Sequence, residues 1–163
     1  MKKILCLMAC IFMISCGKNS VSAFADTGGL AEEICRKSGW NMNNVYRETV
    51  DESFAFAFGI SADEFDERVE YAVCLRETVD SKGRVLYVFE ADEASDAIWL
   101  GQKIYAAYEF APCDVAEKMT VAVSGKYVML FKSDSAETES AAQSFRSLTG
   151  GALRFKKERN NHA

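Results

Sequence analysis

The feature that most constrains the fold is a pair of strand-like segments followed by a helix-like segment, a pattern that occurs twice after residue 68. In each pair a short turn-forming stretch, 80–83 or 124–126, separates two runs with the character of β-strands. The strands that we expect are 69–75, 85–89, 119–123 and 127–131. Hairpins followed by helices predict an α+β domain, in which an antiparallel sheet of about four strands has helices packed on one face.

The pattern of apolar residues predicts a different degree of burial for different strands. Along 69–75 apolar residues alternate with more polar ones, which predicts a strand buried on one face. Segment 85–89 is apolar on both faces, which predicts a central strand. Segment 51–59 fits either a strand or a helix, and we favour a helix because Phe54 and Phe58 stand four residues apart.

Helix starts are marked by short polar residues that can cap a first turn. Asp92 and Asp134 precede the helices that follow the two hairpins, and Ser61 opens a capping box. Apolar spacing over 30–34 predicts a further helix near the beginning of the domain.

The first 15 residues have the form of an export signal peptide. Lys2 and Lys3 precede a largely apolar, uncharged run of about 12 residues, which is shorter than the ~20 residues needed to span a bilayer. The stretch MISC (13–16) resembles the lipobox of bacterial lipoprotein precursors. The resemblance implies that the Cys16 sulfur takes a diacylglycerol, that the chain is cut before Cys16, and that the protein is anchored on the extracytoplasmic side of the cell membrane.

Other interpretations of the N-terminus stay open. Residues 7–10 also look like a lipobox, but they leave an apolar run of only about six residues. Residues 23–25 form an A-x-A site, and a cut before Asp26 would release a secreted, soluble protein. A third interpretation is an uncleaved N-terminal helix, but it does not explain why Lys2 and Lys3 directly precede an apolar run. We therefore expect lipid attachment at Cys16, with secretion after a cut before Asp26 as the alternative.

Length and charge suit one folded domain after such a signal. The chain has 163 residues and a formal net charge of −5, which becomes more negative once Lys2 and Lys3 are removed. This charge gives no basic surface for a nucleic-acid partner. We expect a lipoprotein signal peptide at 1–15, a flexible linker at 16–27, a single α+β domain at 28–151 and a basic polar tail at 152–163.

Common catalytic and cofactor motifs are missing from the sequence. The single histidine, His162, stands next to the last residue, where little surrounds it to hold a catalytic geometry. No glycine-rich phosphate loop, dinucleotide fingerprint or C-x-x-C pair occurs. We therefore assign no catalytic, cofactor-binding or metal-binding residue and expect no cofactor.

Two groups of carboxylates have competing explanations. One lies at 63–67, and the other consists of Glu90, Asp92, Glu93 and Asp96, which have the chemistry to ligate calcium. Carboxylates are also favoured at helix starts by the helix dipole, and we prefer this structural explanation for both groups.

Three cysteines remain in the expected domain, namely Cys35, Cys74 and Cys113. Their odd number permits one disulfide with a free thiol, but a core of this size needs no cross-link, so we favour three buried thiols. A nucleophilic thiol needs a nearby cation or helix N-terminus, which the local sequence does not guarantee.

The two tryptophans and the basic tail are candidate binding residues, for a partner and for anionic lipid respectively. Exposed tryptophans suit a glycan or protein partner, yet we expect Trp40 and Trp99 to pack at the edge of the core. The tail either contacts anionic lipid near the tether or, as we prefer, forms a solvated end of the chain. Its basic residues are Arg154, Lys156, Lys157 and Arg159.

Three segments are similar to a lipoprotein family of Firmicutes labelled domain of unknown function 4358. They are FGISADEF (58–65), VLYVFEADEASDA (85–97) and FAPCDVAEKMTVAVSGKYVMLFKSD (110–134). The stretch GKYV (125–128) matches the family's last strand, whereas FAP (110–112) replaces its usual Y-x-P. The resemblance implies a secreted, usually lipid-anchored domain, and it implies no activity because the family has none assigned.

The sequence thus predicts a membrane-anchored extracytoplasmic domain that acts as a binding or accessory module of the cell envelope. Its expected partners are the membrane, through lipid on Cys16, and an envelope protein or glycan. The alternatives are a secreted soluble protein and an envelope enzyme that uses carboxylates or a cysteine. A pocket that unites Cys74 or Cys113 with a lysine or arginine would favour the enzyme.

Overall fold

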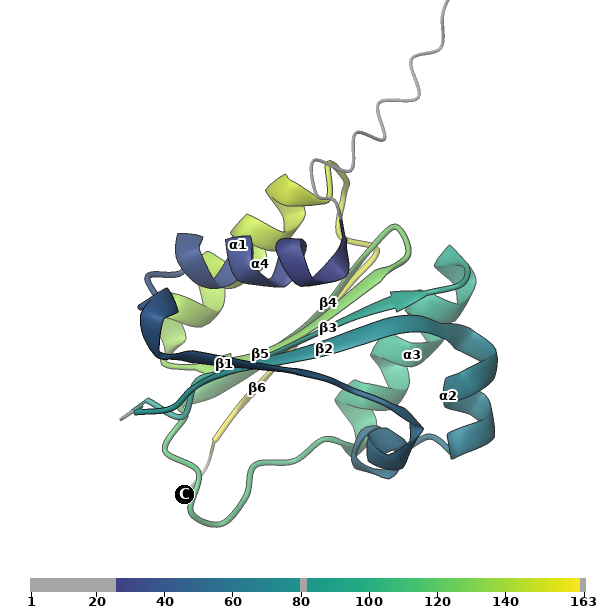
Figure 1. Ribbon diagram of the computed structural model, residues 1–163, viewed down its shortest axis with the longest axis horizontal. Helices are drawn as coiled ribbons and strands as arrows, with labels where there is room; N and C mark the ends of the chain where they lie inside the picture. Colours follow the sequence, from purple (N-terminus) through teal and green to yellow (C-terminus); the bar gives the residue numbers. More distant parts are fainter. Residues whose placement is uncertain (1–25, 80–81, 162–163) are drawn as a thin grey trace, which may run out of the picture.

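The computed structural model describes residues 26–79 and 82–161, so that Cys16, the predicted signal peptide and His162 lie outside the described residues. The described chain forms one sheet of six antiparallel strands in the order β1-β2-β3-β5-β4-β6 (Figure 1). The α+β class is confirmed, with more strands than the four or so that we predicted. The strands are β1 Val45–Thr49, β2 Val69–Glu77, β3 Val85–Ala91, β4 Lys118–Ser124, β5 Tyr127–Ser133 and β6 Phe155–Asn160.

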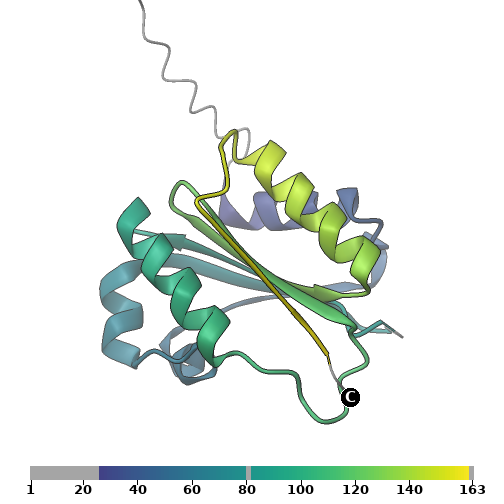
Figure 2. The ribbon, with the colours of Figure 1, turned by 180° about the vertical axis from the view of Figure 1, so that it is seen from behind.

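Helices cover both faces of this sheet (Figures 1 and 2). One face carries α1 (Thr27–Lys37) and α4 (Ser135–Leu148). The other carries α2 (Ala62–Arg68), α3 (Ala94–Ala107) and the 3₁₀ helix η2 (Glu52–Phe58), while a short 3₁₀ turn, η1 (Met42–Asn44), leads into β1. The prediction of helices on one face was therefore wrong. The physical reason is that the four central strands bury side chains on both faces, and each apolar face needs a cover.

Strand β2 shows where the sequence pattern misled. Val73 and Leu75 belong to the core beneath α1 and α4, but Ala72 and Cys74 are equally buried in the core beneath η2, α2 and α3. The prediction of a strand buried on one face was wrong, because small side chains on the second face are also covered. The central position of the 85–89 strand is confirmed, since β3 lies between β2 and β5.

The strands that the sequence did not reveal, β1 and β6, form the edges of the sheet. The whole of β6 pairs with β4, so that the segment expected to be a solvated tail is part of the sheet. Arg159 ties this strand to α3, because its guanidinium donates to the backbone carbonyls of Tyr105 and Tyr108 at 2.6 and 2.8 Å. Basic side chains on an edge strand also discourage pairing with other chains.

Helix caps follow the predictions in two of three cases. The capping box is confirmed, with the Ser61 hydroxyl accepting from the Glu64 N–H at 3.1 Å. Asp134 accepts from the N–H of Glu137 at 2.8 Å and starts α4. The prediction for Asp92 was wrong, because the residue before α3 is Glu93, and its side chain accepts no capping hydrogen bond from a backbone N–H of the helix.

An ion-pair network joins the β2–β3 hairpin to the start of α4. The Arg84 guanidinium donates to the carboxylate of Glu77 at 2.7 Å and to that of Glu137 at 2.8 Å. Glu137 also accepts from Lys82 and from the Ser133 hydroxyl, both at 2.6 Å. Burial raises the pKa of Glu137, but these bonds outweigh burial and lower that pKa to about 2.

This network makes stability depend on pH, and we expect the free energy of unfolding to fall as the pH drops from about 5 to 2. The pKa of Glu137 is depressed in the folded chain, so its contribution is complete above the unfolded value of 4.5 and is lost as the pH falls through the folded value. The contribution is on the order of 3 kcal/mol. Urea unfolding at neutral and acidic pH measures it, with Glu137→Gln as the comparison. A variant whose stability varies with pH as steeply as that of the wild type would contradict this assignment.

Candidate functional site

The three cysteines lie in different settings. Cys35 of α1 and Cys74 of β2 are buried on opposite faces of the sheet, whereas Cys113 is exposed in the loop between α3 and β4. All three are free thiols, so the prediction of buried thiols is confirmed for two and wrong for Cys113. Burial raises the pKa of both buried thiols, that of Cys74 to about 11, and they therefore stay protonated at neutral pH.

Two of the four carboxylates in the group at 90–96 are engaged in ion pairs. Glu90 forms an ion pair with Lys126 at 2.6 Å and accepts a hydrogen bond from the Thr27 hydroxyl. Asp96 pairs with Arg68 at 2.5 Å. Among residues 26–79 and 82–161, no three His, Cys, Asp or Glu side chains are placed to hold a metal ion. These contacts fit the structural explanation better than a calcium site.

The tryptophans pack at the edge of the core, as predicted. Trp40 is 5% exposed and lies against Phe131, with ring centroids 5.8 Å apart. Trp99 is half-buried, and the Arg68 guanidinium and Lys103 ammonium stand 4.7 and 5.5 Å from its ring centre. Neither ring is free to form a broad binding surface.

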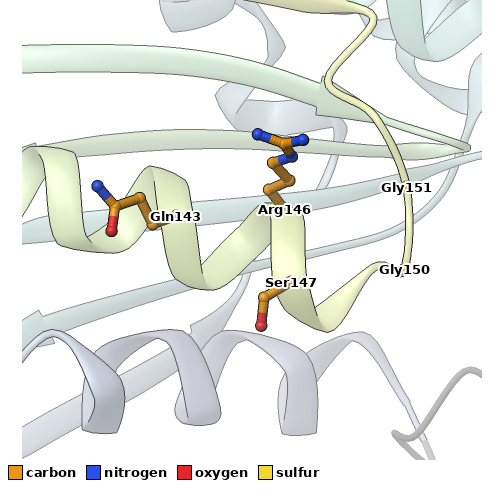
Figure 3. A pocket seen from close by; sticks show the side chains of 5 residues that line it. All are labelled: Gln143, Arg146, Ser147, Gly150 and Gly151. Carbon is orange, nitrogen blue, oxygen red and sulfur yellow. The ribbon is translucent and has the colours of Figure 1, made fainter.

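A shallow hollow of about 350 Å³ lies at the end of α4, lined by Gln143, Arg146, Ser147, Gly150 and Gly151 (Figure 3). In this view Arg146 points up from the helix and Ser147 points down, while Gln143 lies about one turn earlier along α4. Small-molecule sites bring a few polar groups together around one ligand position. The hollow lacks that convergence, and we assign it no ligand.

Two exposed phenylalanines on η2 form a better candidate. Phe56 is 79% exposed and Phe54 is 42% exposed, while Ala55 and Phe58 of the same helix are each 1% exposed. We call Phe54 and Phe56 together the η2 aromatic surface. Large apolar side chains left open to water are typical of surfaces that bind a partner when they form a contiguous patch.

The inward side of η2 holds this surface in place. The Phe58 ring packs edge-on against Phe89 and Tyr87, with centroids 4.9 and 5.2 Å away, and it stacks on Tyr108 at 6.2 Å. These rings belong to β3 and to the residue that ends α3. The exposed rings are thus carried by a helix whose position the core fixes.

The chain in and after η2 is rich in carboxylates. Residues 51–67, which comprise η2 and most of the α2 helix packed against it, contain six carboxylates and no lysine or arginine. Five of these carboxylates are exposed and, within the described residues, form no ion pair: Asp51, Glu52, Asp63, Asp66 and Glu67. The exposed rings therefore belong to a strongly acidic part of the chain.

Gly59 ends η2 and brings it against α3. Its backbone is left-handed, with φ of 72°, and a Cβ at this position would stand 2.4 Å from the Cβ of Ala107. We expect Gly59→Ala to lower the free energy of unfolding by about 2–3 kcal/mol, through backbone strain and this clash. Gly39→Ala is the matched control, because Gly39 has φ of 85° but open space around it. Gly39→Ala should lower the free energy of unfolding by about 1 kcal/mol. Equal losses for the two variants in urea unfolding would contradict the close contact between Gly59 and Ala107.

This surface was not predicted from the sequence. The predicted helix placed Phe54 and Phe58 on one face, yet only Phe58 is buried. A 3₁₀ helix has three residues per turn, so residues four apart do not share a face as they do in an α-helix. Phe56 was the residue that could have indicated an exposed ring. It does not fit the four-residue spacing of Phe54 and Phe58, and it lies in an acidic stretch.

No family model, no curated protein and no solved structure matches this chain. Within residues 26–79 and 82–161, no helix is both long and apolar enough to cross a membrane. The resemblance to the lipoprotein family stays a prediction, and function has to be argued from the surface itself.

Proposed function

We propose that this chain is an extracytoplasmic domain tethered to a bacterial cell membrane through lipid on Cys16, and that it acts by binding a partner in the cell envelope. The observation that carries the binding proposal is the η2 aromatic surface, with Phe56 79% exposed on a helix that Phe58 fixes to the core. The tether rests on the sequence of the first 16 residues.

The exposed rings can supply part of the free energy that recognition of a partner requires. Fully burying one phenylalanine side chain contributes roughly 1.5–3 kcal/mol. Because η2 is already ordered by Phe58 and Gly59, little conformational freedom is lost when Phe54 and Phe56 are covered. Aromatic side chains in such positions commonly carry much of the energy of a protein interface.

The described chain begins on a different face of the sheet from the η2 aromatic surface. Helix α1 starts at Thr27, about ten residues after Cys16, and a chain of that length spans at most about 35 Å. Helix α1 lies with α4 on one face, while η2 belongs to the layer on the other face (Figure 1). A domain held on the α1 side is therefore able to present the η2 aromatic surface away from its attachment.

The alternative of a cysteine-dependent enzyme has little support at Cys74. The positive charge of Lys132 acts to lower the pKa of this thiol, but burial outweighs it and the pKa is raised to about 11. The Lys132 ammonium is itself paired with Asp114 and lies 5.9 Å from the ring centre of Tyr108. A secreted soluble protein, released by a cut before Asp26, is the alternative to the tether.

Photocrosslinking in living cells tests the binding proposal. A benzophenone amino acid at position 56 should give a defined adduct, whereas the same group at position 79 should not. Val79 is a suitable control because it is 81% exposed and lies in the β2–β3 connection, away from η2. The adduct should disappear when Phe54→Ser is added. Equal crosslinking at both positions, or none at either, would contradict a binding role for this surface.

A further inference from the structure

We infer that the partner of the η2 aromatic surface is a protein segment that presents lysine or arginine side chains beside apolar ones. This inference rests on the proposed function and specifies the chemistry of the partner. Its basis is that the exposed rings of η2 and unpaired carboxylates lie close together in the chain, on η2 and on the α2 helix packed against it.

The segment that carries the rings is acidic, while the basic side chains on the neighbouring elements, Arg68 and Lys103, lie over the Trp99 ring. Residues 51–67 carry six carboxylates and no lysine or arginine, and five of the carboxylates are exposed without an ion pair in the described chain. The opposite face differs, because Glu33 and Glu139 pair with Arg36 and Lys156. A partner that covers η2 would bring its own charges within the screening length of about 8–10 Å. An acidic partner would be repelled there, and a basic one attracted.

Aromatic rings favour the same partner. The faces of phenylalanine rings attract ammonium and guanidinium groups. This chain already uses that contact, since Arg68 lies over Trp99 and Lys132 lies 6.0 Å from the ring centre of Phe110. Phe54 and Phe56 are thus able to take both an apolar side chain and a neighbouring cation.

A neutral glycan and an anionic polymer are less suitable occupants. A neutral glycan makes no use of the carboxylates, so its binding would be nearly independent of salt. An anionic polymer would meet repulsion from all five exposed carboxylates. The basic, apolar protein segment is the occupant that uses every feature of the surface.

The roles of the rings and carboxylates differ in a measurable way. The carboxylates of residues 51–67 should speed association and make it sensitive to salt. The rings should slow dissociation, since most affinity differences at one interface arise there. The two groups can therefore be changed separately.

The test uses two peptides of equal length with the same leucine and phenylalanine positions, one carrying lysines and the other glutamates. Binding to the full chain with Cys16→Ser is measured by fluorescence anisotropy at 50 and 300 mM NaCl. We expect the lysine peptide to bind at least tenfold more tightly than the glutamate peptide, and to weaken several-fold at the higher salt. The double variant Phe54→Ser and Phe56→Ser should bind it at least tenfold more weakly while keeping its circular dichroism spectrum.

Two matched pairs of charge variants test whether the lysine peptide is attracted to the proposed surface or only to the overall negative charge of the protein. Asp63→Asn with Glu67→Gln removes two carboxylates from the proposed surface, and Glu33→Gln with Glu139→Gln removes two from α1 and α4 on the opposite face. Only the first pair should weaken binding, by about threefold or more. Equal weakening by both pairs, stronger binding of the glutamate peptide, or unchanged binding by the phenylalanine variant would overturn the inference. If an adduct still forms at position 56 with an acidic protein or a glycan, the binding proposal stands and only the basic partner is wrong.

Discussion

Replacing Arg84 with methionine should lower the free energy of unfolding by about 3–5 kcal/mol, one of the largest losses that a single change in this chain can cause. The Arg84 side chain is 14% exposed and pairs with Glu77 and Glu137, whose side chains are 5% and 14% exposed. Without the guanidinium, two nearly buried carboxylates lose their main positive partner. Urea unfolding at pH 7, followed by circular dichroism, measures the loss.

Arg36→Met is the control for this change. Arg36 also pairs with a glutamate, Glu33, but its side chain is 57% exposed, and exposed pairs contribute only about 0–1 kcal/mol. If both variants lost equally little stability, the hairpin–helix network would be no stronger than a surface pair. The cost of Arg84→Met should also shrink in acid, where the carboxylates are protonated.

Replacing Phe58 with alanine should lower the free energy of unfolding by about 3–5 kcal/mol, because a fully buried ring leaves a cavity. Phe58 is 1% exposed and contacts the rings of Phe89, Tyr87 and Tyr108. The same change should loosen η2 and weaken whatever the η2 aromatic surface binds. Thermal or urea unfolding gives the stability, and hydrogen exchange over residues 52–58 reports the order of the helix.

Phe56→Ala is the matched control from the same helix. Its side chain is 79% exposed, so its removal should change stability by no more than about 0.5 kcal/mol. Equal losses for the two variants would mean that η2 does not point one ring into the core and one into solvent. That result would remove the basis of the binding surface.

Of the three helix starts predicted from signals within one helical turn, two were correct. The capping box at Ser61 and the cap at Asp134 were predicted because a cap is decided by residues three positions apart. The edge strands were not, because their pairing partners are distant: Glu48 lies opposite Cys74, and Lys157 lies opposite Val121. Neither segment has an alternation of apolar residues of its own. Each forms a strand because it pairs with the neighbouring strand, β2 or β4.

The residues of the candidate site could be found in the sequence, but which of them are exposed could not be predicted from it. Phe54, Phe56 and the surrounding carboxylates are contiguous in the sequence. Which ring faces solvent is decided by contacts with Phe89 and Ala107, which follow more than 30 residues later. The 3₁₀ geometry of η2 depends on the same contacts, and a spacing rule for α-helices was the wrong guide.

The intact mass of the protein from the membrane fraction of a bacterial host, compared with a Cys16→Ser form, tests the proposed tether most directly. The account predicts a chain that begins at Cys16 and carries the additional mass of acyl groups, both lost in the variant together with membrane association. A soluble chain that begins at Asp26 and carries no acyl mass would contradict it, and the η2 aromatic surface would then belong to a secreted protein.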